Sequence, residues 1–234
     1  VQFSKEEDQR NGHPAATSFH MARGWSDMYP ELQFFNDFPE GPRKDATFVT
    51  DIPNRGFSGG AIITKNPPTI EWSVSQRFHP MYGKFTASED LTVVGRTMGY
   101  RAIEIYRYAE VLLIYAEAKA ASGGLDATAL SALNQVKRRA AGLDPNTPNA
   151  SVDVTTATVQ DIIDEKGWEL AAEHKRWFDL VRTETLESAI LKRDPTEQVP
   201  LVRQPGKAQY ISPIPAEAIA TSKLVQNPQG FKIQ

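Results

Sequence analysis

The chain has 234 residues and a formal net charge of -3, with 26 Lys and Arg residues against 29 Asp and Glu residues. This length is enough to bury a core and to form a binding or catalytic site, and the nearly balanced charge argues against a basic surface for nucleic acid. The sequence contains no cysteine, which excludes disulfides, thiolate metal sites, cysteine nucleophiles and, in this chain, a lipidated cysteine.

The first residues do not have the features of a targeting segment. Val1 is followed by Gln2 and Phe3, without an initiator Met and without the charged and then apolar pattern of a signal peptide. No apolar run approaches the roughly 20 residues that a helix needs to cross a bilayer. We therefore expect the chain to be a processed or truncated piece, shortened at its N-terminus.

Residues 1–99 are predicted to form a loop-rich region with short strands, which displays aromatic side chains to a ligand. They contain 13 of the 22 aromatic residues and 8 of the 16 prolines, without sustained periodicity. The candidate strands are residues 47–49, 61–64 and 69–74.

Residues 100–234 are predicted to form a helical scaffold. Apolar residues recur at helical spacing over residues 100–122, and Gly123 with Gly124 ends that helix. A second amphipathic helix is expected over residues 126–141, so the two form a hairpin. Since a solenoid generally needs at least about three repeats, this hairpin must pack on a third helix or on repeats missing from the piece.

The third helix is predicted from Thr158 to about Thr183, because Thr158 and Asp161 have the spacing of a capping box. Prolines and glycines interrupt the chain after Pro195, and a short helix is expected to begin near Ala216. The predicted fold class is therefore mainly α, and the regions 1–99 and 100–234 are expected to belong to one structural domain.

Two predicted helices each carry a group of acidic residues on one face. These are Glu110 and Glu117 on the first helix, and Glu165, Glu169 and Glu173 on the third. Such carboxylates could serve glycoside hydrolysis, but a catalytic pair generally faces a cleft from separate elements. The nearby Arg107 and Arg176 favour ion pairs within and between helices instead. We predict that Glu169, Glu173 and Arg176 are ion-paired or hydrogen-bonded within the scaffold.

The sequence shows no motif for a metal, a cofactor or a nucleophile. The four histidines lack the spacing of metal ligands, and no G-x-S-x-G, G-x-G-x-x-G or G-x-x-x-x-G-K-[ST] pattern occurs. We therefore expect no catalytic residue, no cofactor and no metal site.

Aromatic rings on loops are the candidate ligand-binding residues. Trp25 and Tyr29 lie in a segment with turn residues at both ends, and Trp72 lies in the next loop-rich stretch. A flat ring suits the apolar C–H face of a pyranose, while nearby polar groups suit its hydroxyls. The alternative, favoured for any single ring, is a small satellite core. Four phenylalanines are assigned to the core: Phe34, Phe35, Phe38 and Phe85.

Four blocks of sequence follow one another in the order found in a known family. Residues 105–118 have the pattern R-x-A-E-x-L-L-x-x-A-E-A, and residues 134–143 are similar to N-x-V-R-x-R-A-G-L. Residues 165–182 are similar to E-R-x-x-E-L-x-x-E-x-x-R-W-x-D-L-x-R, and residues 213–231 to P-I-P-x-x-E…Q-N-P-G-Y. Together these blocks resemble the SusD/RagB family of Bacteroidetes outer-membrane nutrient-binding lipoproteins.

The resemblance implies a tetratricopeptide-like helical scaffold, an α/α superhelix whose loops hold the ligand site, in a protein about twice this long. This chain would be its C-terminal portion, without the signal peptide, the lipidated cysteine and the N-terminal repeats. Members of the family bind glycans at the cell surface and cover a TonB-dependent, SusC-like outer-membrane transporter without catalysis. Membrane contact would be made only through an N-terminal lipid anchor that is absent from this chain.

The leading hypothesis is therefore a non-catalytic glycan-binding subunit of an import complex, with Trp25, Tyr29 and Trp72 as its ligand-binding residues. One alternative is a helical-repeat scaffold for a protein partner, or a binder of another nutrient such as peptide, without direct glycan binding. The other is a glycoside hydrolase with a pair of Glu residues. Exposed rings that converge on one face favour glycan, and buried rings favour a scaffold.

Overall fold

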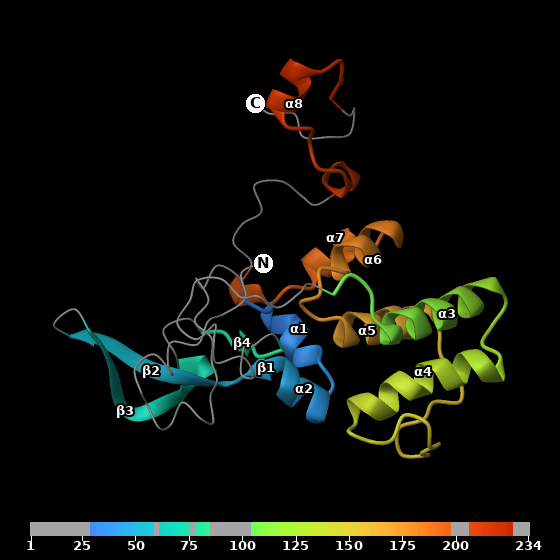
Figure 1. The fold of residues 1–234 in the computed structure, drawn as a ribbon, viewed down its shortest axis with the longest axis horizontal. Coiled ribbons are helices and arrows are strands. Elements are labelled where there is room, and N and C mark those ends of the chain that lie inside the picture. The colour runs from blue at the N-terminus through green and yellow to red at the C-terminus, as the bar shows by residue number, and fades with distance from the viewer. Residues whose placement is uncertain (1–28, 59–60, 75–77, 85–103, 198–205, 227–234) are drawn as a thin grey trace. The chain divides into compact units, whose positions relative to one another are not determined.

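The computed structural model describes residues 29–58, 61–74, 78–84, 104–197 and 206–226 (Figure 1). The chain divides into two units, Val1–Glu173 and His174–Gln234. This boundary differs from the change in composition near residue 99. The described residues of the aromatic-rich region, 29–58, 61–74 and 78–84, are called the aromatic segment below. This segment and the helical hairpin consequently lie in the same unit.

Three helices form the scaffold of the first unit: α3 (Tyr108–Ser122), α4 (Ala127–Ala140) and α5 (Val159–Glu169). They pack on one another, with α3 and α4 as the predicted hairpin (Figure 1). Thr158 and Asp161 form the predicted capping box at the start of α5. The shared buried core of the three helices consists of Ala109, Leu113, Ala116, Leu133, Val136 and Ile162. The two alanines of this core allow the helices to approach one another closely. The structure thus confirms the mainly α fold class.

Two buried polar side chains, one turn apart on α4, fix the loop that leads to α5. The Asn134 amide donates to the carbonyl of Val154 and accepts from its N–H, both at 2.9 Å. Arg138 donates two hydrogen bonds of 2.6 Å to the carboxylate of Asp153 and a third, of 2.9 Å, to the carbonyl of Pro145. Bidentate charged pairs of this kind are among the stronger hydrogen bonds in proteins. They explain the Asn and the Arg in the block 134–143.

The first scaffold helix begins at Tyr108 and not at the predicted Tyr100. Arg107 has extended backbone angles, φ -139° and ψ 158°, so the helical conformation starts only after it. Residues 104–107 are not helical, and 100–103 lie outside the described residues.

The predicted third helix is in fact two helices. α5 ends at Glu169, and α6 (Arg176–Arg182), which belongs to the second unit, begins only after a turn. In this turn Ala172 and His174 each have a φ of 62°. Residues with a Cβ rarely adopt this left-handed backbone conformation. The regular spacing of Glu165, Glu169 and Glu173 in the sequence does not predict the turn.

The aromatic segment contains two short helices that the sequence did not predict, α1 (Leu32–Asp37) and α2 (Pro42–Thr47). Its strands form two antiparallel pairs: β1 (Phe48–Val49) with β4 (Met81–Tyr82), and β2 (Asp51–Ser58) with β3 (Ala61–Glu71). The candidate strand at 47–49 is confirmed at 48–49, since Thr47 ends α2. The candidates at 61–64 and 69–74 belong to the same strand, β3, which ends at Glu71, where the chain turns into a 3-10 helix, η2 (Trp72–Val74).

A second core is built from aromatic rings. Phe48 lies edge-to-face with Phe35 and Phe38, at ring-centroid distances of 5.1 and 5.0 Å. Partly buried residues complete the cluster around them and the buried Ala171: Phe34, Trp72, Tyr82 and Trp168. The assignment of Phe34, Phe35 and Phe38 to the core is confirmed, and Phe85 lies outside the described residues.

The second unit is described over five short elements: α6, α7 (Leu186–Leu191), η3 (Pro195–Glu197), η4 (Lys207–Tyr210) and α8 (Ala216–Thr221). α6 packs on α7, and α8 confirms the helix expected near Ala216. In neither unit does a described helix have the length and apolar character that a membrane crossing requires.

The turn after α5 generates a stability prediction. Ala172→Gly should raise the free energy of unfolding by about 0.5–1 kcal/mol, because relief of the left-handed conformation outweighs the entropic cost of glycine. The neighbouring Ala171→Gly is the control. Ala171 is buried in the aromatic cluster without a positive φ, so losing its methyl group should lower stability. Denaturant unfolding of both variants distinguishes the effects, and a destabilised Ala172→Gly variant would contradict the prediction.

Candidate functional site

Two of the three predicted ligand-binding rings lie in the described structure. Trp72 is half-buried, with its ring edge-to-face with Phe35 at 5.5 Å. Tyr29 is also half-buried, and its ring lies 5.3 Å from that of His79. Trp72 thus lies against the aromatic core, and Tyr29 lies against His79. Trp25 lies outside the described residues, and its place remains a prediction.

The same stretch exposes two apolar side chains that the sequence did not single out, Val74 and Phe78. Phe78 is 61% exposed and has a φ of 54°. A bulky residue in this region of conformational space is uncommon, and such backbone outliers cluster at functional sites. No feature of the sequence distinguishes Phe78 from the phenylalanines of the core. We name the described residues Tyr29, Trp72, Val74, Phe78 and His79 the aromatic segment site.

Polar groups accompany these rings. The Glu71 carboxylate accepts hydrogen bonds from the N–H of Ser73, at 2.9 Å, and from its hydroxyl. Burial, together with the nearby Glu31, raises the pKa of Tyr82 to about 12, so its phenol remains protonated near neutral pH. The Tyr29 hydroxyl is buried and, within the described part of the chain, has no hydrogen-bond partner. A buried phenol in this state has unused capacity to donate and accept.

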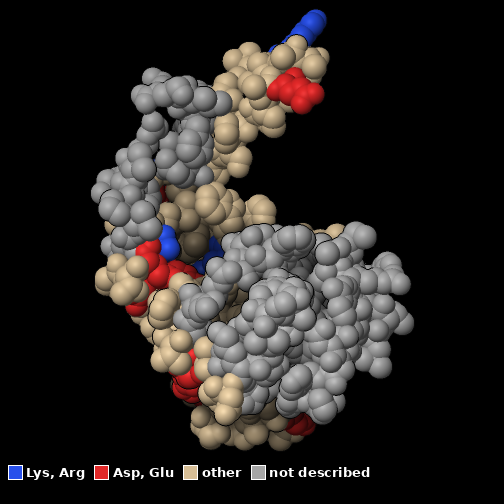
Figure 2. All heavy atoms as spheres, turned by 90° about the vertical axis from the view of Figure 1, so that its left-hand side faces the viewer, with Lys and Arg blue, Asp and Glu red and all other residues tan. Residues whose placement is uncertain are grey.

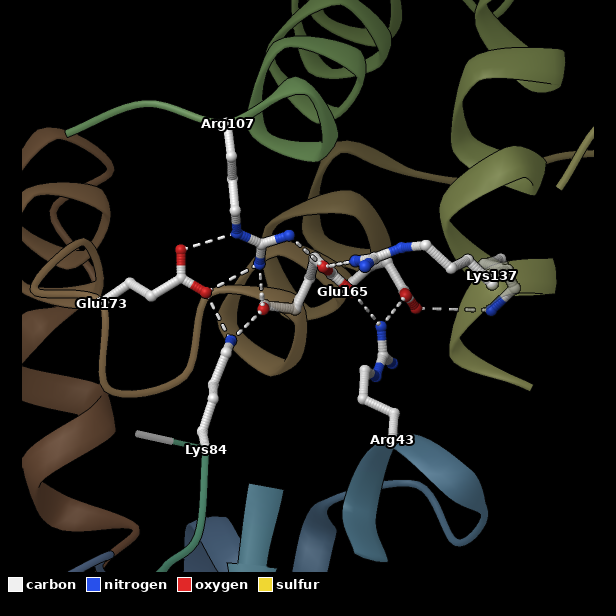
Figure 3. A network of polar contacts seen from close by, with 8 residues as sticks. Arg43, Lys84, Arg107, Lys137, Glu165 and Glu173 are labelled. Carbon is white, nitrogen blue, oxygen red and sulfur yellow. Dashed lines mark hydrogen bonds and ion pairs between the residues drawn. The ribbon is translucent and has the colours of Figure 1, made fainter. Parts of the chain in front are cut away.

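A network of charged side chains joins the aromatic segment to the helices (Figure 3). Glu165 and Glu169 lie one turn apart on α5, and Glu173 lies in the turn that follows. Glu165 and Glu169 are each only 2% exposed. Among the described residues, five cationic side chains from four parts of the chain reach these carboxylates: Arg43, Lys84, Arg107, Lys137 and Arg139.

Arg107 makes the most contacts in this charge network. Its Nε and Nη2 donate to the two carboxylate oxygens of Glu173 at 2.7 and 2.8 Å. Its Nη1 donates to Oε1 of Glu169 at 2.5 Å, and its Nη2 also reaches the Glu169 carbonyl. That carbonyl is at the C-terminus of α5, where helix carbonyls lack partners within the helix. These contacts with Glu169 and Glu173 are therefore consistent both with the extended backbone of Arg107 and with the end of α5 at Glu169, before the predicted Thr183.

The other cations approach from both sides of α5. Lys84 donates to the Glu169 carbonyl at 2.8 Å and to the Glu173 carboxylate. From α2, Arg43 donates to Glu165 at 2.6 Å and to Glu169 at 3.2 Å. From α4, the Lys137 ammonium lies 3.5 Å from Glu165, and Arg139 contacts Glu169.

Gly83, next to Lys84, lies close to the segment that carries β1. A Cβ at Gly83 would lie 2.9 Å from Cγ2 of Val49. The Gly83 N–H donates to the carbonyl of Thr47 at 2.8 Å, which extends the contact between the segments that carry β1 and β4. A side chain at position 83 would therefore displace the strand pair next to Lys84.

Burial and pairing oppose each other in setting the pKa values of the network. Burial alone would raise the pKa of Glu173, but hydrogen bonds from Arg107 and Lys84 outweigh it and lower that pKa. For Lys84, burial dominates over its pairing with Glu173 and lowers the pKa. A general acid needs a raised pKa, so Glu173 is suited to ion pairing and not to proton donation. The predicted ion pairing of Glu169 and Glu173 is confirmed by these contacts, while that of Arg176, in α6, stays a prediction.

A cavity of about 300 Å³ lies beside the network. Its lining mixes charged and apolar side chains and contains no aromatic ring: Pro39, Glu40, Arg43, Lys137, Ala140, Ala141, Ser151, Val152 and Glu165. It is thus distinct from the aromatic segment site. Figure 2 shows acidic and basic atoms side by side at one place on the described surface, with smaller acidic groups elsewhere on this face. The described residues also contain no group of three metal-ligating side chains.

These features define the class of protein: a helical scaffold, stabilised by buried ion pairs, that carries a loop-rich aromatic segment. The sequence matches the SusD family over residues 42–230, and the chain belongs to that family. The predicted SusD/RagB assignment is thereby confirmed.

Two relatives illustrate the similarity. SusD-like protein P2 of Formosa agariphila is 27% identical over 216 residues, which is 89% of this chain and 41% of that protein. A solved SusD superfamily protein from Parabacteroides distasonis is 26% identical, with a TM-score of 0.58, and the match covers 97% of this chain and 48% of that one. The chain therefore spans less than half the length of either relative.

The charge network generates a prediction about stability. Glu169→Gln should lower the free energy of unfolding by up to about 3–5 kcal/mol, because it removes a buried counter-charge from the partly buried Arg43 and Arg107 while preserving volume. Glu184→Gln, which removes an exposed ion pair with Lys207, is the matched control and should cost at most about 1 kcal/mol. Denaturant unfolding is the measurement. Equal effects of the two substitutions would show that the network is not a stabilising element.

A second prediction concerns pH. The pKa of Glu173 is lowered in the folded protein from its ordinary value of 4.5, so its ionised form stabilises the fold. This contribution is fully present above about pH 4.5 and is lost as the pH falls below it toward the folded-state pKa. Glu173→Gln should be less stable than the parent at pH 7, and its stability should decline less between pH 5 and pH 3. Parallel curves of thermal midpoint against pH would contradict this.

Proposed function

We propose that this chain is the C-terminal portion of a non-catalytic glycan-binding protein of the cell surface, which delivers its ligand to a TonB-dependent, SusC-like outer-membrane transporter. Membership of the SusD family supports a nutrient-binding or glycan-binding role in general. Family membership also supports an outer-membrane location with a lipid anchor. Because the chain spans less than half of each relative, the proposal concerns the longer protein.

The observation that carries the glycan proposal is the aromatic segment site. Phe78 is exposed in a left-handed conformation, and Trp72 keeps part of its ring surface accessible in the same stretch of chain. Ring faces of this kind stack on the C–H face of a sugar. Trp25, four residues before Tyr29, is proposed as a further ring of the site.

The alternative is a scaffold for a protein partner, or a site for another nutrient such as peptide. It is favoured by the packing of Trp72 on Phe35, since a ring that completes a core needs no ligand to explain it. Exposed Val74 and Phe78 would suit apolar peptide side chains as well as sugar. Binding measurements with both ligand classes separate these possibilities.

The absence of catalysis is part of the proposal. Glu165, Glu169 and Glu173 are ion-paired to basic side chains, an arrangement that supports a structural role for the acidic residues first considered for glycoside hydrolysis. Glycan binding would then rest on ring stacking and hydrogen bonds alone.

The ring variants test the proposed site. Trp25→Ala and Phe78→Ala should each weaken binding of the cognate oligosaccharide by up to about tenfold, since one stacked ring contributes roughly 1 kcal/mol. Phe178→Ala is the matched control, because Phe178 is exposed to a similar degree but lies in α6 of the second unit. Calorimetric titration of the folded variants, with peptides as competing ligands, is the measurement.

Three outcomes would overturn the proposal in different ways. Equal affinities of the parent and both ring variants would remove the aromatic segment site. Binding of peptides with no binding of any oligosaccharide would favour the alternative nutrient. Release of sugar products that a single Glu or Asp substitution abolishes would establish an enzyme.

A further inference from the structure

The charge network contains more cations than carboxylates. The three glutamates on and after α5 face five cationic side chains: Arg43, Lys84, Arg107, Lys137 and Arg139. Asp161, one turn before Glu165 on α5, interacts electrostatically with Lys137 and adds one negative charge. Positive charge is therefore in excess among these described residues. Cations that are withdrawn from water without enough counter-charge are costly, so the network favours an added anion.

Arg43 leaves most of its hydrogen-bond donors unused. Its Nη1 donates to Glu165 at 2.6 Å and to Glu169 at 3.2 Å, whereas its Nε and Nη2 have no hydrogen-bond partner among the described residues. A guanidinium carries five N–H donors in a fixed plane. The same group lies over the ring of Phe38, 5.7 Å from its centroid, which restricts its orientation. The Arg43 side chain is only 13% exposed, and polar groups buried to this degree usually have partners.

Lys137 also retains donors for a further acceptor. Its ammonium lies 3.5 Å from Glu165, beyond the usual length of a hydrogen bond, and makes no other ion pair with the described residues. An ammonium has three N–H donors and no acceptor. Arg43 and Lys137 therefore share the carboxylate of Glu165, and neither is saturated by it (Figure 3).

Both side chains line the cavity of about 300 Å³ beside the network. Arg43 reaches it from α2 and Lys137 from α4, and Glu165 of α5 is a third lining residue. Pro39 and Val152 add apolar surface to the wall, which displaces water and strengthens electrostatic attraction inside. The volume is at the lower end of the roughly 300–1,000 Å³ of small-molecule sites. The cavity is therefore large enough for a small ligand.

The acidic groups at the cavity do not reverse its preference for negative charge. Glu165 is already engaged by two cations, and the exposed Glu40 pairs with Lys44. The C-terminus of α4 also lies at the cavity, and the dipole of a helix disfavours anions there. The last turn of α4 carries three basic side chains, Lys137 among them, which oppose this dipole.

We propose that this cavity binds a small oxyanion, such as a carboxylate, sulfate or phosphate group, through Nε and Nη2 of Arg43 and the ammonium of Lys137. An oxyanion presents several acceptors at once, so it fits a guanidinium better than a neutral hydroxyl does. The group belongs either to a free inorganic ion or to a larger anionic ligand. The inference does not rest on the aromatic segment site, so glycan binding and anion binding can fail separately.

Titration with inorganic phosphate tests the proposal. The longest natural form of the protein should bind phosphate saturably at constant ionic strength, which separates a site from general screening. Lys137→Gln should weaken this binding at least about tenfold, because it removes a charged donor and leaves an uncharged side chain. Lys119→Gln is the matched control, since Lys119 is a helical lysine that pairs with Asp126 and does not line the cavity. Isothermal titration calorimetry is the measurement.

Nuclear magnetic resonance locates the bound anion without a change in the site. The Nε–H signal of Arg43, assigned by its loss in Arg43→Lys, should shift in the parent with the same midpoint as the calorimetric titration. Phosphate binding that leaves this signal in place would put the anion elsewhere and contradict the proposal.

Glycerol phosphate and glycerol identify the source of the anion. Equal affinities for phosphate and glycerol phosphate indicate a free ion, and tighter binding of glycerol phosphate indicates a larger anionic ligand. Glycerol that binds as tightly as glycerol phosphate would assign the cavity to a neutral polyol and overturn the proposal. An absence of saturable phosphate binding, or an equal loss in Lys119→Gln and Lys137→Gln, would overturn it as well.

Discussion

The fold depends on three acidic residues at the end of one helix. Glu165, Glu169 and Glu173 receive cations from α2, from the segment after β4, from the start of α3 and from α4. Only α4 is next to α5 in the order of elements, and the other three parts lie farther away along the chain. Because Glu165 and Glu169 are almost completely buried, each unpaired charge would cost several kcal/mol, so the elements are constrained to the positions at which pairing is complete.

α5 also connects the two cores. Ile162 belongs to the helical core, while Trp168 and Ala171, at the end of the helix and just after it, belong to the aromatic cluster. The charge network lies on the same helix, so displacement of α5 would disturb apolar packing and ion pairing together. Lys84 brings this constraint close to the aromatic segment site, because it follows β4, which ends at Tyr82.

The elements that the sequence predicted well are those determined by neighbouring residues. The capping box of Thr158 and Asp161 and the stop at Gly123 each depend on atoms within a few residues, so the boundaries of α5 and α3 could be placed there. The start of α3 and the end of α5 depend on contacts between Arg107 and Glu169, 62 residues apart, and periodicity carries no signal of these. The residues of the proposed site are visible in the sequence only in part: Trp72 and Tyr29 are recognisable as rings in a loop-rich region, whereas neither the exposure nor the left-handed backbone of Phe78 has a signal in the sequence.

Buried charge is a costly way to join elements, and its use here has a structural consequence. Apolar side chains of similar volume often stabilise a fold as well or better, but they tolerate rotation and sliding. The Arg107 guanidinium donates to both oxygens of Glu173 and also to Glu169, a geometry that a shift of one ångström would break. A ligand surface on loops binds well only if its support holds the rings in place before the ligand arrives. Directional ion pairs at Arg43, in α2, and at Lys84, after β4, hold the aromatic segment at two points, which is the support that the proposed ligand site requires.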